Sequence, residues 1–428
     1  MAAPYTNGAP RIHRYAAVQR ITGILLMLFS LTMLPPVFVD LLYENSVTNS
    51  FLLSMAITFA TGAVVWWPVH RARSELRTRD GFLVTVLFWT VLSVFGAIPL
   101  YAAHLAWNNY TDAMFEAVSG LTTTGATVVS HGIDQLPHAI NFYRTQLHWL
   151  GGMGIIVLAV AILPMLGIGG MQMYRAGAPG PMKDSKLTPR ITGTARALWV
   201  VYVLLTLACG ITYWLLGMSV FDAICLAMST LATGGFTPHD ASIAYFNSFP
   251  IEVAAMVFML LGASNFSLHY IAFRQRSLGV YLRDTEFLAG IGIVAVMGVL
   301  VCAPLYLAGT YPDLFTCIRK GMFQLIAYGA DAGFSTADPS DWPGYVPMML
   351  VLATFMVSSA GGTGGGVKVV RLVLFVKQAM RELQRLVHPN AEVAIKLDGK
   401  IVSNDVVYAV GGFFSVYIGS TVLLSFIM

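Results

Sequence analysis

Three short glycine-containing stretches are the part of this sequence best suited to chemistry. They are Thr122–Thr127 around Gly125, Ala232–Thr237 around Gly235, and Ala330–Ser335 around Gly333. A hard monovalent cation gives up its water only where oxygen atoms replace it, and rings of backbone carbonyl groups can do so. Carbonyl groups that all turn to one side need backbone torsions that side chains resist, whereas glycine adopts them at little steric cost. The three stretches therefore have the composition of a cation-coordinating backbone.

The residues next to each glycine are the predicted ion-binding residues. They are Thr123, Thr124, Gly125 and Ala126, then Thr233, Gly234, Gly235 and Phe236, then Asp331, Ala332, Gly333 and Phe334. Thr123 and Thr233 can add hydroxyl oxygens, and Asp331 occupies their position in the third stretch, where a carboxylate would be a strong local charge.

Three further aspartates follow the stretches at a short distance, namely Asp134, Asp240 and Asp338. They either raise the local cation concentration or are ordinary solvated loop carboxylates, and both interpretations remain open.

The sequences around the three glycines match when the glycines are placed in register. Asp112, Asp222 and Lys320 share one preceding position, and Thr127, Thr237 and Ser335 share one following position. The third copy agrees less well than the first two. A match at the same place in three successive units favours internal duplication over unrelated polar loops with turn glycines.

Short helices are predicted directly before the glycine stretches, at Thr111–Leu121, Val220–Leu231 and Leu314–Tyr328. Each is shorter than a membrane span. A helix C-terminus carries about half a negative elementary charge, so three such helices would direct a cation-attracting field at the stretches.

Composition indicates the environment of these elements. The chain has 428 residues, of which 57% are hydrophobic and 11% charged, whereas a soluble domain carries roughly 25% charged residues. Nine long apolar blocks are expected, most of them long enough to cross a hydrocarbon core of about 30 Å as helices. They are Val18–Leu42, Phe51–Val69, Gly81–Ala103, Ile140–Leu166, Ala197–Leu216, Ile251–Phe273, Phe287–Leu307, Tyr345–Val376 and Val406–Met428.

The loops between the blocks differ in charge. His70–Asp80 and Met171–Arg196 are rich in Lys and Arg, whereas Leu42–Ser50, His104–His138 and Gly217–Phe249 contain neither. The fourth of these alternate loops, Ala308–Gly344, is an exception, because it contains Arg319 and Lys320. The positive-inside rule therefore predicts a cytoplasmic N-terminus. Because the basic residues lie mostly in short loops, nucleic acid is not an expected partner.

The eighth block is interrupted by glycines. The interruption consists of Gly361, Gly362, Thr363, Gly364, Gly365 and Gly366, and Lys368 follows. Each glycine inside a helix costs about 1 kcal/mol relative to alanine, which favours an unwound loop. A phosphate-binding loop is disfavoured because no Gly-Lys-Ser/Thr ending follows. Close helix packing through small residues remains an alternative.

Four runs of sequence resemble the Trk/Ktr superfamily of potassium transporters. They are SGLTTTGAT (Ser119–Thr127), HWLGGMGI (His148–Ile155), STLATGGFTPHDAS (Ser229–Ser242) and SSAGGTGGGVKVVR (Ser358–Arg371). The two apolar blocks ahead of the first repeat resemble the TrkH-like branch.

The resemblance implies an all-α integral membrane protein with tandem helix–pore loop–helix repeats around a central pore, preceded by two extra transmembrane helices. It implies a pore-forming subunit for potassium uptake across the bacterial cytoplasmic membrane, usually dimeric and regulated by a cytosolic nucleotide-binding ring such as TrkA. The family's filter glycines correspond to Gly125, Gly235 and Gly333, and the loop Gly361–Gly366 with Lys368 corresponds to a gate beneath the filter. Potassium is the expected substrate at the ion-binding residues, membrane lipid surrounds the chain, and no cofactor is expected.

The resemblance also suggests a division of the chain. Residues 1–79 form a two-helix region, followed by pore repeats at 80–170, 171–277 and 278–386 and by the first helix of a fourth repeat at 387–428. Because family members have four repeats, a non-conducting membrane scaffold or a truncated pore fragment is the alternative to a conducting subunit.

An enzyme is not expected. His148 and His269 lie in apolar blocks, but the sequence has no HExxH motif and no readable pairing of a nucleophile with a base.

Overall fold

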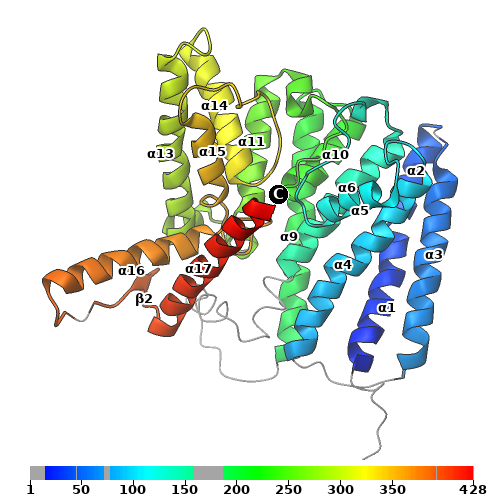
Figure 1. Ribbon diagram of the computed structural model, residues 1–428, viewed down its shortest axis with the longest axis horizontal. Coiled ribbons are helices and arrows are strands. Elements are labelled where there is room, and N and C mark those ends of the chain that lie inside the picture. Colours follow the sequence, from blue (N-terminus) through cyan, green and yellow to red (C-terminus); the bar gives the residue numbers. More distant parts are fainter. Residues whose placement is uncertain (1–14, 45, 72–77, 158–186, 392, 428) are drawn as a thin grey trace, which may run out of the picture. The chain divides into compact units, whose positions relative to one another are not determined.

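The structure, a computed structural model, describes residues 15–44, 46–71, 78–157, 187–391 and 393–427. The described residues are mostly helical (Figure 1), in agreement with the expected all-α membrane fold. They form two compact units. One contains the described residues up to Thr122 together with Ala126–Leu147, and the other contains Thr123–Gly125 and the described residues from His148 onwards.

The first unit is built from helices that follow the early apolar blocks. They are α1 (Ala16–Leu31), α2 (Leu34–Leu42), α3 (Thr48–Trp66), the 3-10 helix η2 (Trp67–Val69), α4 (Thr78–Ala102), α5 (Tyr110–Leu121), η3 (Ile133–Gln135) and the first half of α6 (His138–Val157). α1 and α3 cross at two glycines. A Cβ atom on Gly23 would lie 2.8 Å from the carbonyl oxygen of Gly62. Small residues at such a crossing let two membrane helices approach closely.

The second unit holds the remaining elements. They are α9 (Leu187–Leu215), α10 (Val220–Leu231), η5 (Ser242–Phe246), α11 (Phe249–Ala263), α12 (Phe266–Gln275), η6 (Leu278–Arg283), α13 (Thr285–Leu307), α14 (Leu314–Gly329), α15 (Val346–Thr354), α16 (Val369–Val387), strands β1 (Lys396–Leu397) and β2 (Lys400–Ile401), and α17 (Asn404–Ile427). β1 and β2 pair antiparallel as a small hairpin. α13, α14 and α15 pack against one another (Figure 1) and share a hydrophobic core with α9, α10 and α11.

Six helical segments of the described part of the chain are long and apolar enough to cross a membrane. They are Ala16–Leu42, Thr48–Val69, Leu83–Ala102, Ala195–Leu215, Thr285–Leu307 and Asn404–Ile427. The chain is therefore a multi-pass membrane protein, as its composition predicts.

Two apolar blocks are broken, the first against expectation and the second, at its glycines, as the sequence predicts. The block Ile251–Phe273 is broken between α11 and α12, whose axes differ by 101°. The block Tyr345–Val376 forms the short α15 and the start of α16, with non-helical chain over the glycines between them. Elsewhere, α9 begins inside the basic segment expected as the loop Met171–Arg196, of which residues 171–186 lie outside the described part. Residues 158–166 of the block Ile140–Leu166 also lie outside it.

Candidate ion-coordinating site

The three glycine segments, defined as Thr122–Thr127, Ala232–Thr237 and Ala330–Ser335, share one pattern of backbone φ angles. Thr123, Thr233 and Asp331 have φ of 56°, 52° and 56°, and Gly125, Gly235 and Gly333 have φ of 74°, 93° and 65°. The residue between each pair keeps a negative φ. Alternation of left-handed and ordinary residues turns successive carbonyl groups toward one side, which is the arrangement needed to replace a cation's water.

The helix ends explain the left-handed threonine and aspartate. At the end of α10, Gly234 N–H donates to Ser229 O (3.0 Å) and Thr233 N–H donates to Thr230 O (3.1 Å). The end of α14 repeats this, with Ala332 N–H donating to Ala327 O (2.8 Å) and Asp331 N–H to Tyr328 O (3.0 Å). This pair of bonds is the Schellman motif, whose left-handed residue is usually glycine. Thr233 and Asp331 take that position at a cost on the order of 1 kcal/mol each.

The glycines of the three segments lie close together, and at Gly125 and Gly235 no side chain fits. A Cβ atom on Gly125 would collide with the carbonyl oxygen of Gly234. One on Gly235 would lie 2.7 Å from Ala332 O and 3.0 Å from the Cα atom of Gly333, and one on Gly333 would lie 3.4 Å from the Cα atom of Gly235. The backbones of three segments separated by about a hundred residues therefore converge at these glycines.

The other predicted ion-binding residues differ in exposure. Phe236 and Phe334 are buried, so they contribute backbone and packing to the site. Thr233 is buried, whereas Thr124 and Ala126 are exposed. Ala126 belongs to the first unit.

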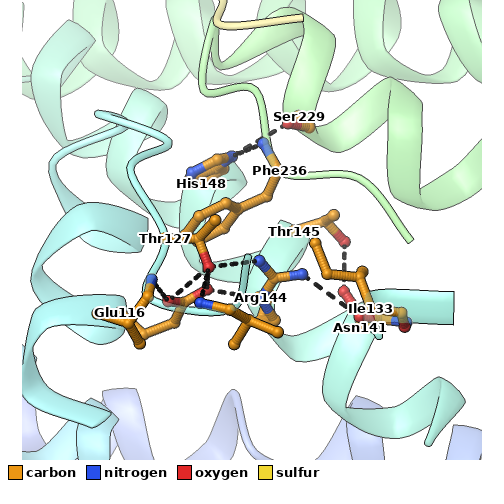
Figure 2. Close-up of polar contacts among 11 residues, drawn as sticks. Glu116, Thr127, Ile133, Asn141, Arg144, Thr145, His148, Ser229 and Phe236 are labelled. Atoms are coloured by element: carbon orange, nitrogen blue, oxygen red, sulfur yellow. Dashed lines mark hydrogen bonds and ion pairs between the residues drawn. The ribbon is translucent and has the colours of Figure 1, made fainter. Parts of the chain in front are cut away.

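A buried histidine supports the second glycine segment (Figure 2). The His148 ring stacks on Phe236 with centroids 4.1 Å apart. Its Nδ1 atom lies 3.0 Å from Ser229 Oγ and accepts the Phe236 N–H at 3.4 Å. Because a backbone N–H can only donate, Nδ1 is the acceptor, and neutral His148 carries its proton on Nε2. A Cβ atom on Gly234 would collide with this ring. His148 thus packs behind the segment.

In the first unit, a buried ion pair lies next to the first glycine segment (Figure 2). Arg144 Nε lies 2.8 Å from Glu116 Oε1, and both side chains are at most 1% exposed. Thr127 donates to both carboxylate oxygens of Glu116 at 3.0 Å, and Val128 N–H donates to one at 3.4 Å. Glu116 lies on α5 and Arg144 on α6, so the pair joins the half-helix, the chain after Gly125 and the next helix. Sequence reasoning missed this pair. The available signal was one acidic and one basic residue in two segments that are otherwise almost free of charge.

The glycine-rich loop, Gly361–Lys368, also lies against the glycine segments. Thr363 Oγ1 lies 3.0 Å from both Leu231 O and Gly262 O, and 3.2 Å from Thr233 Oγ1. A Cβ atom on Gly365 would collide with the Asp331 carboxylate, and one on Gly364 would lie 2.6 Å from Ala330 O. The loop therefore contacts the ends of the helices that lead into the second and third segments.

The internal geometry of the loop is tight. Gly361, Gly366 and Lys368 have φ of 83°, 77° and 75°. A Cβ atom on Gly362 would collide with Ala263 O and one on Gly366 with Thr354 O. Lys368 Nζ donates to the carbonyl oxygen of Gly364. Glycine is therefore favoured at Gly361 and Gly366 by the positive φ angle, and at Gly362 and Gly366 because a side chain would not fit.

The glycine-rich loop and the residues just before it form hydrogen bonds with the chain at the break between α11 and α12. Ser359 N–H donates to Ala263 O (2.8 Å), Thr363 N–H to Gly262 O (3.0 Å), and Phe266 N–H to Gly361 O (3.1 Å). His269 Nε2, 2.8 Å from Leu261 O, donates to that carbonyl, and Nδ1 lies 2.8 Å from the Tyr281 hydroxyl. His269 thus has a hydrogen-bonding role at the break.

Arg319 and Lys320, the exceptions to the charge pattern of the loops, are paired. Glu252 on α11 is fully buried and accepts from Arg319 at 2.6 and 3.0 Å and from Lys320 at 3.1 Å. These contacts join α11 to α14. The two nitrogens of Arg319 bind the two carboxylate oxygens of Glu252, and this geometry fixes the orientation of both side chains.

The aspartates beyond the segments differ in their surroundings. Asp338 accepts the Ser340 N–H (2.9 Å) and hydroxyl (2.7 Å), which hold the pKa of its carboxyl below the ordinary value. Asp134 lies in η3, and Asp240 follows the second segment. Among the described residues, no group of three or more His, Cys, Asp or Glu side chains is arranged to hold a metal ion.

The sequence and the fold are similar to those of known transport proteins. The family model of TrkH, described as a cation transport protein, matches residues 48–294 and 311–427. The chain is 50% identical over 417 residues to the Trk system potassium uptake protein TrkH of Halomonas elongata, covering 96% of this chain and 84% of that protein. It is 47% identical over 403 residues to TrkH of Escherichia coli, covering 94% and 83% of the two chains. The crystal structure of the potassium transporter TrkH from Vibrio parahaemolyticus is similar to the fold with a TM-score of 0.88, at 45% identity, covering 96% of this chain and 84% of that one.

Proposed function

Because the chain belongs to the TrkH family of cation transport proteins, we propose that it takes up potassium ions through a pore lined by the three glycine segments. It is a membrane transport protein by family and is not an enzyme. The observation that carries the proposal is the convergence of Gly125, Gly235 and Gly333, each with a positive φ and each two residues after another residue with a positive φ.

The coordination chemistry follows from this backbone. Carbonyl oxygens of the predicted ion-binding residues replace the water of the ion, and the C-terminal ends of α5, α10 and α14 add partial negative charge. Asp331 supplies a full charge at a position where the other segments have threonine. The side chains of Phe236 and Phe334 are buried, so selectivity rests on main-chain oxygens.

The glycine-rich loop is the proposed gate of this pore. It contacts Thr233 and Asp331, and α16 begins at the residue that follows it. Motion of α16 would therefore reach the loop directly. A cytosolic nucleotide-binding subunit of the TrkA type, acting on a homodimer of this chain, is the proposed source of that motion.

The proposed setting is the bacterial cytoplasmic membrane with the N-terminus in the cytoplasm, because the basic residues concentrate in alternate loops. The repeat boundaries at 80–170, 171–277 and 278–386 belong to the same proposal and are supported by the shared segment conformation.

The test is rubidium uptake by vesicles that contain the purified full chain. Potassium in the external medium should compete for uptake, and an equal concentration of sodium should not. Equal competition by the two ions would overturn the selectivity proposal. No uptake by a protein that unfolds cooperatively on heating would favour a non-conducting scaffold instead.

A further inference from the structure

The first turn of α13 carries a buried carboxylate whose hydrogen bonds lie outside its own helix. Glu286 is 9% exposed. Its Oε1 atom accepts the Ala360 N–H at 2.7 Å and the Val370 N–H at 3.3 Å. Ala360 directly precedes the glycine-rich loop, and Val370 follows it by two residues. One oxygen atom therefore holds both ends of the loop.

Other groups cap α13 itself. Asp284 Oδ1 accepts the Phe287 N–H at 2.7 Å. Asp398, at the turn of the β1–β2 hairpin, accepts the Thr285 N–H at 3.0 Å and the Thr285 hydroxyl at 2.5 Å. Since capping is supplied by these two aspartates, the position of the Glu286 carboxylate serves the loop.

Two basic side chains of the loop region act on Glu286. Lys368 inside the loop and Arg371 on the first turn of α16 both attract its carboxylate. Leu397 of the hairpin that carries Asp398 belongs to the same hydrophobic cluster as Val370 and Leu374 of α16. The loop ends, the hairpin and the first turn of α13 thus form one connected junction.

We propose that Glu286 is the positioning residue of the glycine-rich loop and that Asp398 couples the hairpin to it. The inference rests on the proposed gating role of the loop. A glycine-rich segment has large backbone freedom, and the two hydrogen bonds to Glu286, one at each end, restrict it to one path. When Asp398 leaves Thr285, the turn that carries Glu286 loses a cap, and the hold on the loop weakens. A displacement of the hairpin is in this way transmitted to the pore.

The experiment compares hydrogen exchange in the full chain and in variants of Glu286. In Glu286→Ala, the amides of Ala360 and Val370 should exchange about tenfold faster or more, because both lose their hydrogen-bond acceptor. In Glu286→Gln, which retains an acceptor oxygen, the increase should be smaller. The matched control is Glu382→Gln on the exposed face of α16, where the carboxylate pairs with Arg385 at 3.5 Å. It should leave exchange at the loop unchanged.

Rubidium leak through vesicles without a cytosolic partner is the second readout. Glu286→Ala should raise the leak several-fold, and Glu286→Gln should do so less. Unchanged exchange at Ala360 and Val370 in a folded Glu286→Ala protein would overturn the proposal. If that variant does not fold, Asp398→Ala, at an exposed position, replaces it, and unchanged exchange at the same two amides would again overturn the proposal. Because exchange requires no transport, a change in exchange without rubidium uptake in the unmodified chain would refute the proposed function and leave this inference standing.

Discussion

The hydroxyl oxygens of Thr233 and Thr363 lie 3.2 Å apart, which joins the second glycine segment to the middle of the glycine-rich loop. The Thr363 hydroxyl oxygen also lies within hydrogen-bonding distance of Leu231 O and Gly262 O, at 3.0 Å from each. A single side chain therefore connects the loop to the end of α10 and to the break after α11. The proposed filter and the proposed gate share hydrogen bonds and should respond to the same substitutions.

Thr363→Val retains the shape of the side chain and removes its hydroxyl group. We expect a loss of about 1 kcal/mol in stability, because the buried Leu231 carbonyl loses a donor, and a higher rubidium leak without a cytosolic partner. The control is Thr421→Val, where the hydroxyl bonds only within α17, to Tyr417 O at 2.9 Å. A leak equal to that of the unmodified chain would show that the hydroxyl does not restrain the loop.

Gly235→Ala should abolish selective uptake. The added Cβ would lie 2.7 Å from Ala332 O, and φ at this position is 93°. We expect at least about a tenfold loss of rubidium uptake or of the preference for potassium over sodium. Gly217→Ala is a matched control, because φ there is 104° but no atom lies within 4 Å of the added Cβ. It should cost on the order of 1 kcal/mol in stability and leave uptake near normal. Equal loss of uptake in both variants would assign the effect to backbone strain.

Removal of Arg144 should destabilise the protein strongly. Arg144→Met leaves the buried Glu116 carboxylate without its cation, at an expected cost of about 3–5 kcal/mol. Thermal unfolding in detergent measures the loss. The double variant Glu116→Leu with Arg144→Met should be more stable than Arg144→Met alone, because no buried charge then remains unpaired. If the double variant is the less stable of the two, the pair is not coupled as the geometry indicates.

Asp338→Asn should weaken the attraction of cations at low ionic strength. We expect about a twofold rise in the rubidium concentration for half-maximal uptake, and the effect should fade in high salt as screening increases. The pKa of Asp338 is lowered by Ser340, so its charge is present above that pKa and is lost only as the pH falls through it. The difference between the variant and the unmodified chain should therefore stay constant from about pH 8 to about pH 5. A difference that disappears over that range would contradict the assignment.

Local patterns in the sequence predicted the half-helices well. The expected segments Thr111–Leu121, Val220–Leu231 and Leu314–Tyr328 match α5, α10 and α14 to within one residue at each end. Aspartate, serine or asparagine at the start of each and a change to glycine and threonine at the end are signals that act within a few residues. Two of the four runs that resemble the family, Ser119–Thr127 and Ser229–Ser242, begin in the last turns of α5 and α10.

Features that depend on distant residues were not predicted. The chain bends by 101° between α11 and α12, although hydropathy continues across Ser264 and Asn265 and neither residue is glycine or proline. The left-handed conformation of Thr233 and Asp331 was also not expected, since glycine usually occupies such a position. The partners of Glu116 and Glu252 lie on other helices, and one sequence does not reveal such pairs.

The break after α11 has a consequence for how the chain is assembled in the membrane. Carbonyl groups freed by the break, those of Gly262 and Ala263, receive their hydrogen bonds from Thr363 and Ser359. These donors are synthesised only after α13, α14 and α15. Lipid offers no substitute donors, so the bent helix cannot reach its final form when it first enters the bilayer. Closure of this bend is a late step of biogenesis, and the residues proposed to open and close the pore are also those that complete its folding.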